Sequence, residues 1–222
     1  MGTIWKNHLT REASLRYVEN ISAIVLLMSV CSFAGIDLRV GGGLNLSNEI
    51  HSGDFKLTDS YTKKMHAGFN VGANMAVYFT QQLGVVAGLG YETRGSGWKY
   101  ETADNSSSLS ADFSMNYIQI PALFSYKPIP SLAINLGPEL GIFLNGKSTI
   151  GGETTDLDEI KPIDLGVSLN VDYIIMNMIA VGAGYYYGFL NNDDRPRGDF
   201  VKGGITNHNI KLYVAYVFHL ME

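Results

Sequence analysis

The sequence predicts an all-β protein, a closed antiparallel transmembrane β-barrel of about eight strands that is preceded by a signal peptide. Three observations support this fold class. Stretches of strict apolar and polar alternation recur along the chain, each is about 10 to 14 residues long, and the joining segments alternate between long and short. Soluble strands average five or six residues, whereas a tilted membrane strand needs roughly 9–11. Long loops at one end and short turns at the other are typical of outer-membrane barrels.

Residues 67–79 show the alternation most clearly. One row holds Phe69, Val71, Ala73, Met75, Val77 and Phe79, and the other holds Gly68, Asn70, Gly72, Asn74, Ala76 and Tyr78. Successive side chains of a strand point to opposite faces of the sheet. This strand therefore has one apolar face and one face of small and amide side chains.

The first half of the barrel is expected from four segments. They cover residues 36–46, 67–79, 83–98 and 113–127. The first has a glycine- and charge-rich polar row, and the third alternates valine, alanine and leucine with glycine. A short turn at 80–82 joins the second and third, and polar stretches at 47–65 and 101–112 join the others.

The second half is expected from residues 132–145, 163–173, 179–189 and 209–220. Tight turns at 128–131 and 176–177 alternate with polar loops at 147–161 and 191–204. Pro121 and Pro138 lie inside expected strands. Because proline cannot donate a hydrogen bond to a ladder, we expect a β-bulge at each.

Composition agrees with a barrel. Charged residues are 17% of the chain, below the usual quarter of a soluble domain, and glycine (25 residues) and tyrosine (13 residues) are frequent. Glycine weakens helices by about 1 kcal/mol each, so this composition disfavours a helical domain. The net charge of −5 offers no basic stripe for phosphates, and no nucleic-acid partner is expected.

Residues 1–34 are expected to be an N-terminal extension and signal peptide, and residues 35–222 the barrel domain. The apolar run 21–35 is short for a transmembrane helix but suits the hydrophobic region of a signal peptide, with Ser32 and Ala34 before a cut at Gly35. Cys31, the single cysteine, lies in this run. A lipoprotein modified at Cys31 and a retained membrane anchor are the alternatives.

The apolar rows are expected to face lipid. Aromatic side chains gather near the ends of these rows, as in the interfacial girdles of membrane barrels; examples are Phe79, Tyr91, Tyr126, Tyr173 and Phe218. The alternative is a soluble lipocalin-like binding barrel or a sandwich with an apolar interior. That fold would expose the glycine- and amide-rich rows to water.

Nine ionisable residues fall on rows that would face the lumen. They are Asp37, Arg39, Glu92, Arg94, Glu139, Asp164, Asp172, Lys211 and His219. The interior of an eight-stranded barrel is just wide enough for side chains to fill. Buried charges are costly unless they are paired, so we expect a hydrogen-bonded ion network that plugs the lumen. A catalytic or ion-conducting role is the alternative.

Other candidate sites are weaker, and no catalytic residue, cofactor or metal site is predicted. A small lipid-modifying enzyme would need a histidine with a serine and a carboxylate, and His51, His66 and His208 lie near loops without such a partner. The acidic residues Glu153, Asp156, Asp158 and Glu159 lack the spacing of an EF-hand. Arg197, Gly198 and Asp199 spell an integrin-type adhesion tripeptide in an expected surface loop.

Three blocks of sequence resemble the PorT-like family of outer-membrane β-barrels. They are Tyr-Ile-Gln-Ile-Pro-Ala-Leu at residues 117–123, Asn-Leu-Gly-Pro-Glu-Leu-Gly at residues 135–141, and Gly-Leu-Asn-Leu-Ser at residues 43–47. The resemblance covers about residues 36–220. It implies a multi-pass protein in the outer membrane of a Gram-negative bacterium, of a structural or interaction type. A secretion or envelope partner is expected from the family's name-giving member, by fold-level analogy.

The last strand resembles the insertion signal that the barrel-assembly machinery recognises. Lys211 precedes Tyr216 and Phe218 at alternating positions. The strand departs from the signal at Tyr213, where a glycine is usual, and four residues follow Phe218. The expected partners are thus outer-membrane lipid and this machinery, and the barrel is expected to be a monomer.

Overall fold

The computed structural model is a single β-barrel, and it describes residues 34–51, 61–101, 108–157, 161–190 and 205–221. Its strands are β1 (Gly35–His51), β2 (Tyr61–Tyr78), β3 (Leu83–Glu101), β4 (Ser108–Ile129), β5 (Leu132–Ile150), β6 (Glu153–Asp156), β7 (Ile163–Ile175), β8 (Ile179–Gly188) and β9 (Ile205–Met221). Within these ranges no α-helix is long and apolar enough to cross a membrane.

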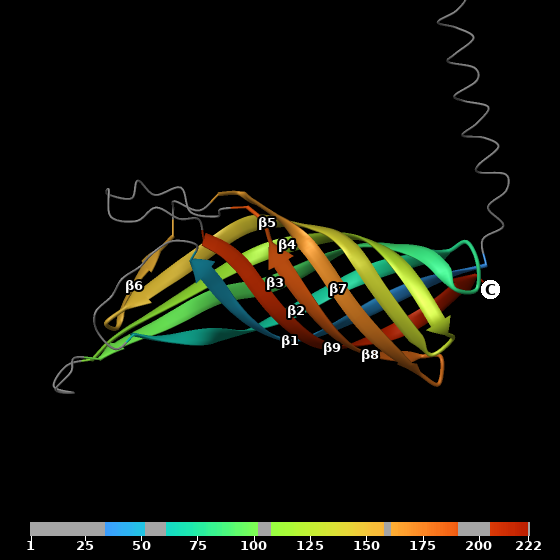
Figure 1. Cartoon of the computed structure of the whole chain (residues 1–222), viewed down its shortest axis with the longest axis horizontal. Coiled ribbons are helices and arrows are strands. Elements are labelled where there is room, and N and C mark those ends of the chain that lie inside the picture. Colours follow the sequence, from blue (N-terminus) through green and yellow to red (C-terminus); the bar gives the residue numbers. More distant parts are fainter. Residues whose placement is uncertain (1–33, 52–60, 102–107, 158–160, 191–204, 222) are drawn as a thin grey trace, which may run out of the picture.

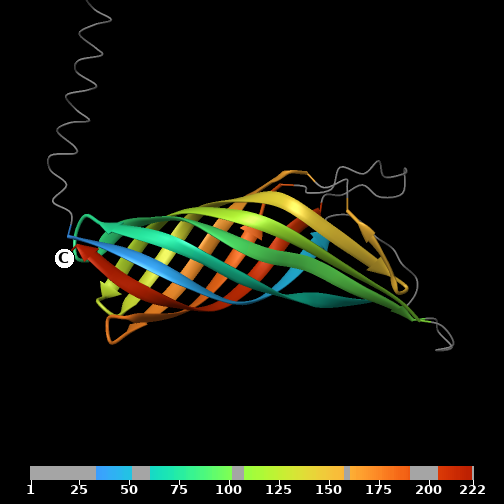
Figure 2. The same cartoon turned by 180° about the vertical axis from the view of Figure 1, so that it is seen from behind.

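Eight strands close into a ring. The order is β1-β2-β3-β4-β5-β7-β8-β9, β9 pairs back to β1, and each pairing is antiparallel. The strands tilt against the long axis of the barrel, and the C-terminal end lies at the same end as the short turns (Figures 1 and 2). The predicted closed, eight-stranded antiparallel barrel is confirmed.

The two rows of each strand meet different environments. On the outside, Leu44 is 71% exposed, and Leu136 is 52% exposed. On the inside, Glu92, Arg94 and Asp164 are fully buried. A soluble lipocalin-like barrel would have an apolar interior, so that alternative is wrong for this chain.

Aromatic side chains flank the apolar outer band at both ends. Near the long loops, Tyr187 and Phe189 contact each other with ring centroids 5.5 Å apart, and near the short turns Tyr216 and Phe218 do so at 4.6 Å. Aromatic girdles at both interfaces are typical of barrels that span a membrane.

Six of the eight strands in the ring extend well beyond this band. β1 and β9 have 17 residues and β2 to β5 have 18 to 22, whereas β7 has 13 and β8 has 10. A membrane strand needs roughly 9–11 residues, so the surplus projects from the end that carries the long loops. β6 pairs with the projecting part of β5, where Lys147 lies opposite Asp156 (Figure 1).

The strand ends at the loop side differ from the sequence prediction. β1 continues to His51, β2 already begins at Tyr61, and β6 lies in a segment that we expected to be a loop. In residues 62–65 of β2 and 153–156 of β6 every side chain is exposed, so the alternation of burial disappears while the backbone pairing continues.

The expected bulges at Pro121 and Pro138 are wrong. The β4–β5 register is the same on both sides of the prolines, from the Pro121–Glu139 pair to the Phe124–Leu136 pair. The pair expected at Pro138 is missing from the β4–β5 ladder, and the pair expected at Pro121 is missing from the β3–β4 ladder, whose register is also unchanged. The strands therefore accommodate each proline by losing hydrogen bonds without inserting a residue. Register shifts occur elsewhere, for example between Asn116 and Tyr117.

Candidate functional site in the barrel lumen

The inward rows of the strands bring the expected lumen charges into three groups along the barrel axis. We define the lower network as Arg39, Tyr78, Asn135, Asp172 and Tyr213, the upper network as Glu92, Arg94, Glu139, Asp164 and Lys211, and the seam cluster as Asp37, Lys127 and His219. Eight of the nine expected residues are buried, and His219 is partly exposed at the end with the short turns.

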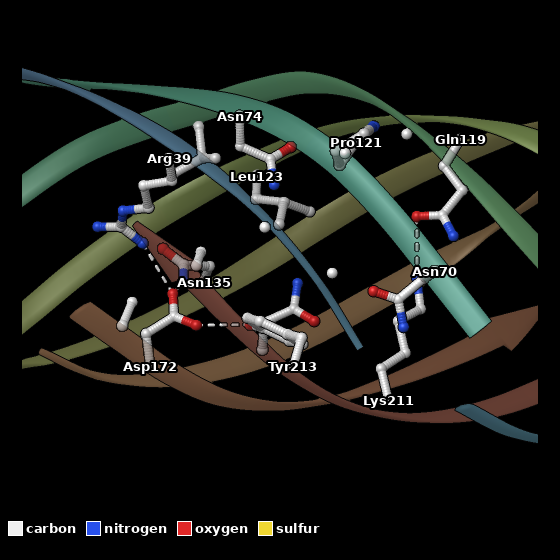
Figure 3. A pocket seen from close by; sticks show the side chains of 18 of the residues that line it. Arg39, Asn70, Asn74, Gln119, Pro121, Leu123, Asn135, Asp172, Lys211 and Tyr213 are labelled. Atoms are coloured by element: carbon white, nitrogen blue, oxygen red, sulfur yellow. Dashed lines mark hydrogen bonds and ion pairs between the residues drawn. The ribbon is translucent and has the colours of Figure 1, made fainter. Parts of the chain in front are cut away.

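Asp172 on β7 is the centre of the lower network (Figure 3). Its Oδ2 accepts hydrogen bonds from Arg39 Nη1 at 2.8 Å and from Asn135 Nδ2 at 2.7 Å, and its Oδ1 accepts one from Tyr213 at 2.5 Å. Arg39 also donates from Nη2 to the Tyr78 hydroxyl at 2.7 Å. One carboxylate therefore links β1, β5, β7 and β9 across the lumen.

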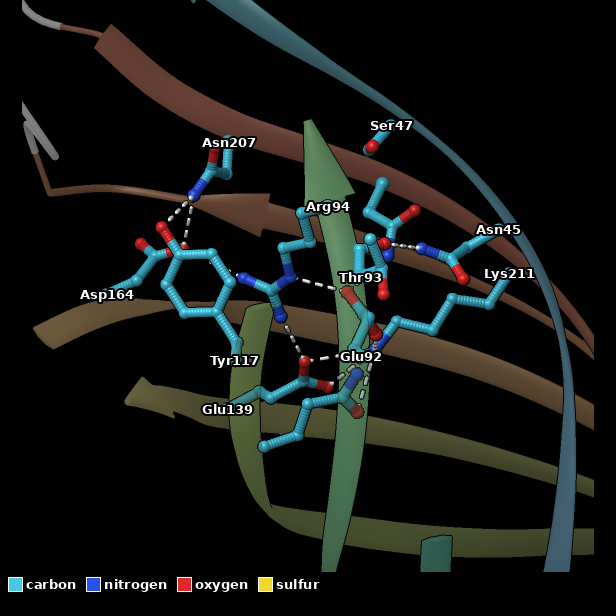
Figure 4. A network of polar contacts seen from close by, with 12 residues as sticks. Asn45, Ser47, Glu92, Thr93, Arg94, Tyr117, Glu139, Asp164, Asn207 and Lys211 are labelled. Atoms are coloured by element: carbon cyan, nitrogen blue, oxygen red, sulfur yellow. Dashed lines mark hydrogen bonds and ion pairs between the residues drawn. The ribbon is translucent and has the colours of Figure 1, made fainter. Parts of the chain in front are cut away.

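Arg94 on β3 is the centre of the upper network (Figure 4). Its guanidinium donates from Nε to Glu92, from Nη1 to Asp164 Oδ2 at 2.8 Å, and from Nη2 to Glu139 Oε1 at 2.9 Å. The guanidinium carbon also lies 4.0 Å from the ring centroid of Tyr186. A planar guanidinium has donors on three sides, so a single arginine can bind carboxylates from β3, β5 and β7.

Lys211 on β9 completes the upper network. Its Nζ lies 2.9 Å from Glu92 Oε2 and donates to Glu139 Oε1 at 3.0 Å and to Gln119 at 3.3 Å. Two cations therefore face the three carboxylates of this network. Amides supply further donors: Asn209 donates to Glu92, and Asn207 donates to Asp164 at 3.0 Å.

A cavity of about 100 Å³ separates the lower network from the upper one. It is lined by Arg39, Asn70, Asn74, Gln119, Asn135 and Tyr213, among other residues (Figure 3). Charged side chains of both networks also form part of its wall, including Glu139 and Asp172. The lumen is thus crossed by ion pairs at two levels, with a small cavity of mixed polar and apolar lining between them.

The seam cluster lies at the end of the barrel that carries the short turns. Asp37 on β1 contacts His219 Nδ1 at 2.7 Å and Lys127 Nζ at 3.4 Å. Lys127 Nζ also lies 3.6 Å from the ring centroid of Tyr78. This cluster and the lower network therefore meet at Tyr78.

Lys127, Asn207 and Asn209 contribute to the site but were not among the expected site residues. Lys127 follows the inward row of β4, and the same odd-number parity as Gln119 and Ser125 could have identified it. Asn209 lies on the expected inward row of the last strand, but an uncharged amide gives no sign in the sequence of a place in an ion network. Asn207 lay before the expected start of the last strand.

The other candidate residues do not gather into a second site. Tyr216 and Phe218 of the expected assembly signal face outward, whereas Lys211 points into the lumen. Glu153 and Asp156 are exposed on β6. Asp158, Glu159 and the tripeptide Arg197, Gly198 and Asp199 lie outside the described residues, as does the side chain of His51.

Near the loops, the described histidine rings contact an aspartate and a tyrosine, and no contact of a serine hydroxyl with these rings is seen among the described residues. His66 Nδ1 lies 3.2 Å from Asp112, and His208 Nδ1 lies 2.7 Å from the Tyr185 hydroxyl. Among the residues that the structure describes, no group of three or more histidine, cysteine, aspartate or glutamate side chains could hold a metal ion. The lumen networks are therefore the site that the fold builds most completely.

Comparison with known proteins places these features in a family. No curated protein sequence matches the chain significantly. Among solved structures, Ail, the attachment invasion locus protein of Yersinia pestis, is 17% identical, covering 83% of this chain and 99% of its own, with a TM-score of 0.48. Neisserial surface protein A is 16% identical over 84% and 99% (TM-score 0.45), and OprG of Pseudomonas aeruginosa is 14% identical over 86% and 99% (TM-score 0.41).

The model of the family described as "Outer membrane protein beta-barrel domain" matches residues 32–194, most of the chain. The match includes β1 to β8 and both lumen networks except for their β9 residues. With an apolar outer band, aromatic girdles and a polar lumen, the structure has the features that such barrels need in lipid. This chain therefore belongs to the outer membrane protein beta-barrel domain family and is a transmembrane protein of the Gram-negative outer membrane.

Proposed function

We propose that this protein is a non-enzymatic barrel whose lumen is plugged and whose working surface is its loop end. The observation that carries this proposal is the upper network. Arg94 reaches from β3 to Glu139 on β5 and Asp164 on β7, and Lys211 reaches from β9 to Glu92 and Glu139. These contacts cross the interior, so solutes would have to break buried ion pairs in order to pass.

The projecting part of β2 to β6 supports an interaction role. It adds polar strand surface beyond the lipid band without contributing to the membrane-spanning wall. The resemblance to PorT-like barrels suggests an envelope or secretion partner, by fold-level analogy. Two of the three resembling blocks lie in β4 and β5, whose inward residues Gln119 and Glu139 both contact Lys211.

Conductance in a planar lipid bilayer tests the plug. The purified barrel should show no steady conductance steps. The double variant Arg94→Ala, Lys211→Ala should show steady conductance steps, because the three buried carboxylates of the upper network repel one another when they lack cations. The variant Glu153→Gln on exposed β6 is the matched control and should behave as the parent does. Steady steps from the parent protein would overturn the proposal that the lumen is plugged.

Site-specific crosslinking tests the interaction role. A photoreactive residue at Thr154 on β6 should give a protein adduct in intact cells, whereas one at the lipid-facing Leu136 should not. A third position, Met176, is 85% exposed in the turn between β7 and β8 and reports on the opposite end. Adducts from Met176 alone would move the working surface to the periplasmic end, and adducts from neither position would contradict an interaction role.

The lipid-modifying alternative has its own test. The acyl pattern of lipid A from cells with and without the protein, measured by mass spectrometry, should be the same. A changed pattern that disappears in the variant His208→Gln would make the protein an enzyme.

Processing, assembly and adhesion complete the proposal. We expect removal of residues 1–34 as an extension and signal peptide, insertion by the barrel-assembly machinery through Lys211, Tyr216 and Phe218, and a monomeric barrel. N-terminal sequencing of the membrane form tests the cleavage.

Replacing Asp199 with glutamate tests the adhesion tripeptide, because unchanged host-cell adhesion would eliminate it.

A further inference from the structure

His219 joins three parts of the barrel at its periplasmic end. It lies on β9, its Nδ1 is 2.7 Å from Asp37 Oδ1 on β1, and its Nε2 is 2.6 Å from the backbone oxygen of Asn177 in the turn between β7 and β8. The side chain is 32% exposed, so solvent protons can reach it. The other described histidine side chains have different partners, since His66 contacts Asp112 and His208 contacts Tyr185.

Both ring nitrogens of His219 face hydrogen-bond acceptors. A backbone carbonyl oxygen can only accept, so Nε2 must carry a proton. An ionised carboxylate can also only accept, so Nδ1 must carry one too. The other oxygen of Asp37 accepts a hydrogen bond from the Lys127 ammonium at 3.4 Å, so both carboxylate oxygens act as acceptors. We infer that His219 is a doubly protonated imidazolium that links β9 to Asp37 of β1 and to Asn177 of the β7–β8 turn, and we call this link the clasp. It holds the closing seam of the barrel, between β9 and β1, and it is lost when the proton is lost.

The clasp lies where the backbone ladder of the seam is irregular. Ile36 pairs with Met221, whereas the next residue, Asp37, pairs with His219, so Leu220 is an extra residue on β9. The turn that supplies the acceptor is tightly defined, since Met176 and Asn177 have φ values of 52° and 57° in the left-handed region. A side-chain contact thus reinforces the seam at the point where the pairing shifts.

Charge counting agrees with a protonated His219. The three networks contain five carboxylates: Asp37, Glu92, Glu139, Asp164 and Asp172. Their permanent cations are Arg39, Arg94, Lys127 and Lys211. An imidazolium at His219 supplies the fifth positive charge. Around the clasp, the part of the chain that the structure describes contributes the charged groups Asp37 from β1 and Lys127 from β4, with the Tyr78 ring beneath Lys127.

Loss of the proton would weaken the seam. A neutral imidazole has one N–H group, so either Asp37 or the Asn177 carbonyl would lose its donor and face a nitrogen lone pair. The clasp therefore stabilises the seam between β1 and β9 while the His219 ring is protonated, and this stabilisation is lost when rising pH removes the proton. The device makes closure of the first and last strands sensitive to periplasmic pH, independently of the function proposed above.

Nitrogen-15 NMR of the histidine rings in the folded barrel tests the protonation directly. At neutral pH His219 should show two protonated ring nitrogens, whereas His208, whose partner is a tyrosine hydroxyl, should not. In the variant Asp37→Asn, His219 should lose its second proton at lower pH. A neutral His219 in the parent at neutral pH, or a titration unchanged by Asp37→Asn, would overturn the inference.

The pH dependence of seam opening tests the consequence. Amide hydrogen exchange at Asp37 and Leu38 on β1, corrected for intrinsic exchange, should become faster as the pH rises from about 6 to about 9. This range covers roughly three pH units and includes the ordinary titration of histidine. A charge-assisted hydrogen bond corresponds to roughly a tenfold change in opening. His219→Gln should remove the extra pH dependence, and the control His208→Gln should retain it. Equal pH dependence in the parent and His219→Gln would refute the clasp.

Discussion

Arg94 and Glu139 form an ion pair across the lumen, from β3 to β5, although β4 separates these two strands in the wall. The Nη2–Oε1 distance is 2.9 Å, and neither side chain is more than 2% exposed. The pair therefore ties together two strands that share no backbone ladder. Because such a pair is desolvated, removal of one partner leaves a buried charge that has no compensation.

Replacing Arg94 with methionine should strongly destabilise the barrel. Three carboxylates would lose their shared cation, and breaking a buried ion pair costs about 3–5 kcal/mol. Urea titration in lipid vesicles measures the free energy of unfolding. The control Lys64→Met removes an exposed cation from β2 and should change this free energy by about 0.5 kcal/mol or less. Similar losses from both variants would contradict a special role for the upper network.

Asp172→Asn should be costly, and Asp112→Asn should be nearly neutral. Asp172 is buried and accepts from Arg39, Asn135 and Tyr213, so the neutral amide should cost about 3–5 kcal/mol of unfolding free energy. Asp112 pairs with His66, but its side chain is 58% exposed, and exposed pairs contribute about 0–1 kcal/mol. The same titration measures both variants, and a reversed order would show that burial does not control these energies.

The sequence predicts the faces of the strands because burial sets the alternation. In the lipid band an outward residue such as Leu136 meets hydrocarbon and an inward residue such as Asn135 meets the lumen, so the contrast is strong. In the projecting residues 62–65 of β2 every side chain is exposed, so both faces meet water. The pairing of residues 61–65 with β3 could not be recognised for this reason.

The sequence also predicts which charges point inward, but not which charges meet. Parity along β3 places Glu92 and Arg94 on one face. Their partners on β5, β7 and β9 depend on the sum of the register offsets between successive strands around the ring. No pattern within one strand contains that information. The central role of Arg94 therefore emerges only from the closed barrel.

Gly182→Val should disrupt the lower network through sterics. An added Cβ at Gly182 would lie 2.4 Å from the Tyr213 ring and 2.5 Å from Asp172 Oδ1. Tyr213 would have to move away from the carboxylate, and we expect a loss of roughly 1–3 kcal/mol or more, as for overpacked interiors. Gly90→Ala is the milder control, because its Cβ would meet Val71 O at 3.2 Å beside the cavity. Unfolding by urea checks both, and equal effects would mean that Tyr213 can relocate freely.

Leu136→Arg should locate the lipid band. Leu136 is an outward residue in the middle of β5, and an arginine on the lipid face near the bilayer midplane costs about 2–4 kcal/mol. Glu153→Arg places the same side chain on exposed β6, beyond the band, where we expect about 0–1 kcal/mol. Urea titration of both variants in vesicles gives the difference, and each variant should still be extracted with the outer-membrane fraction. If Glu153→Arg costs as much as Leu136→Arg, then β6 lies within the membrane. The projecting part of β2 to β5 would then have to be part of the lipid-spanning wall, because β6 pairs with it directly.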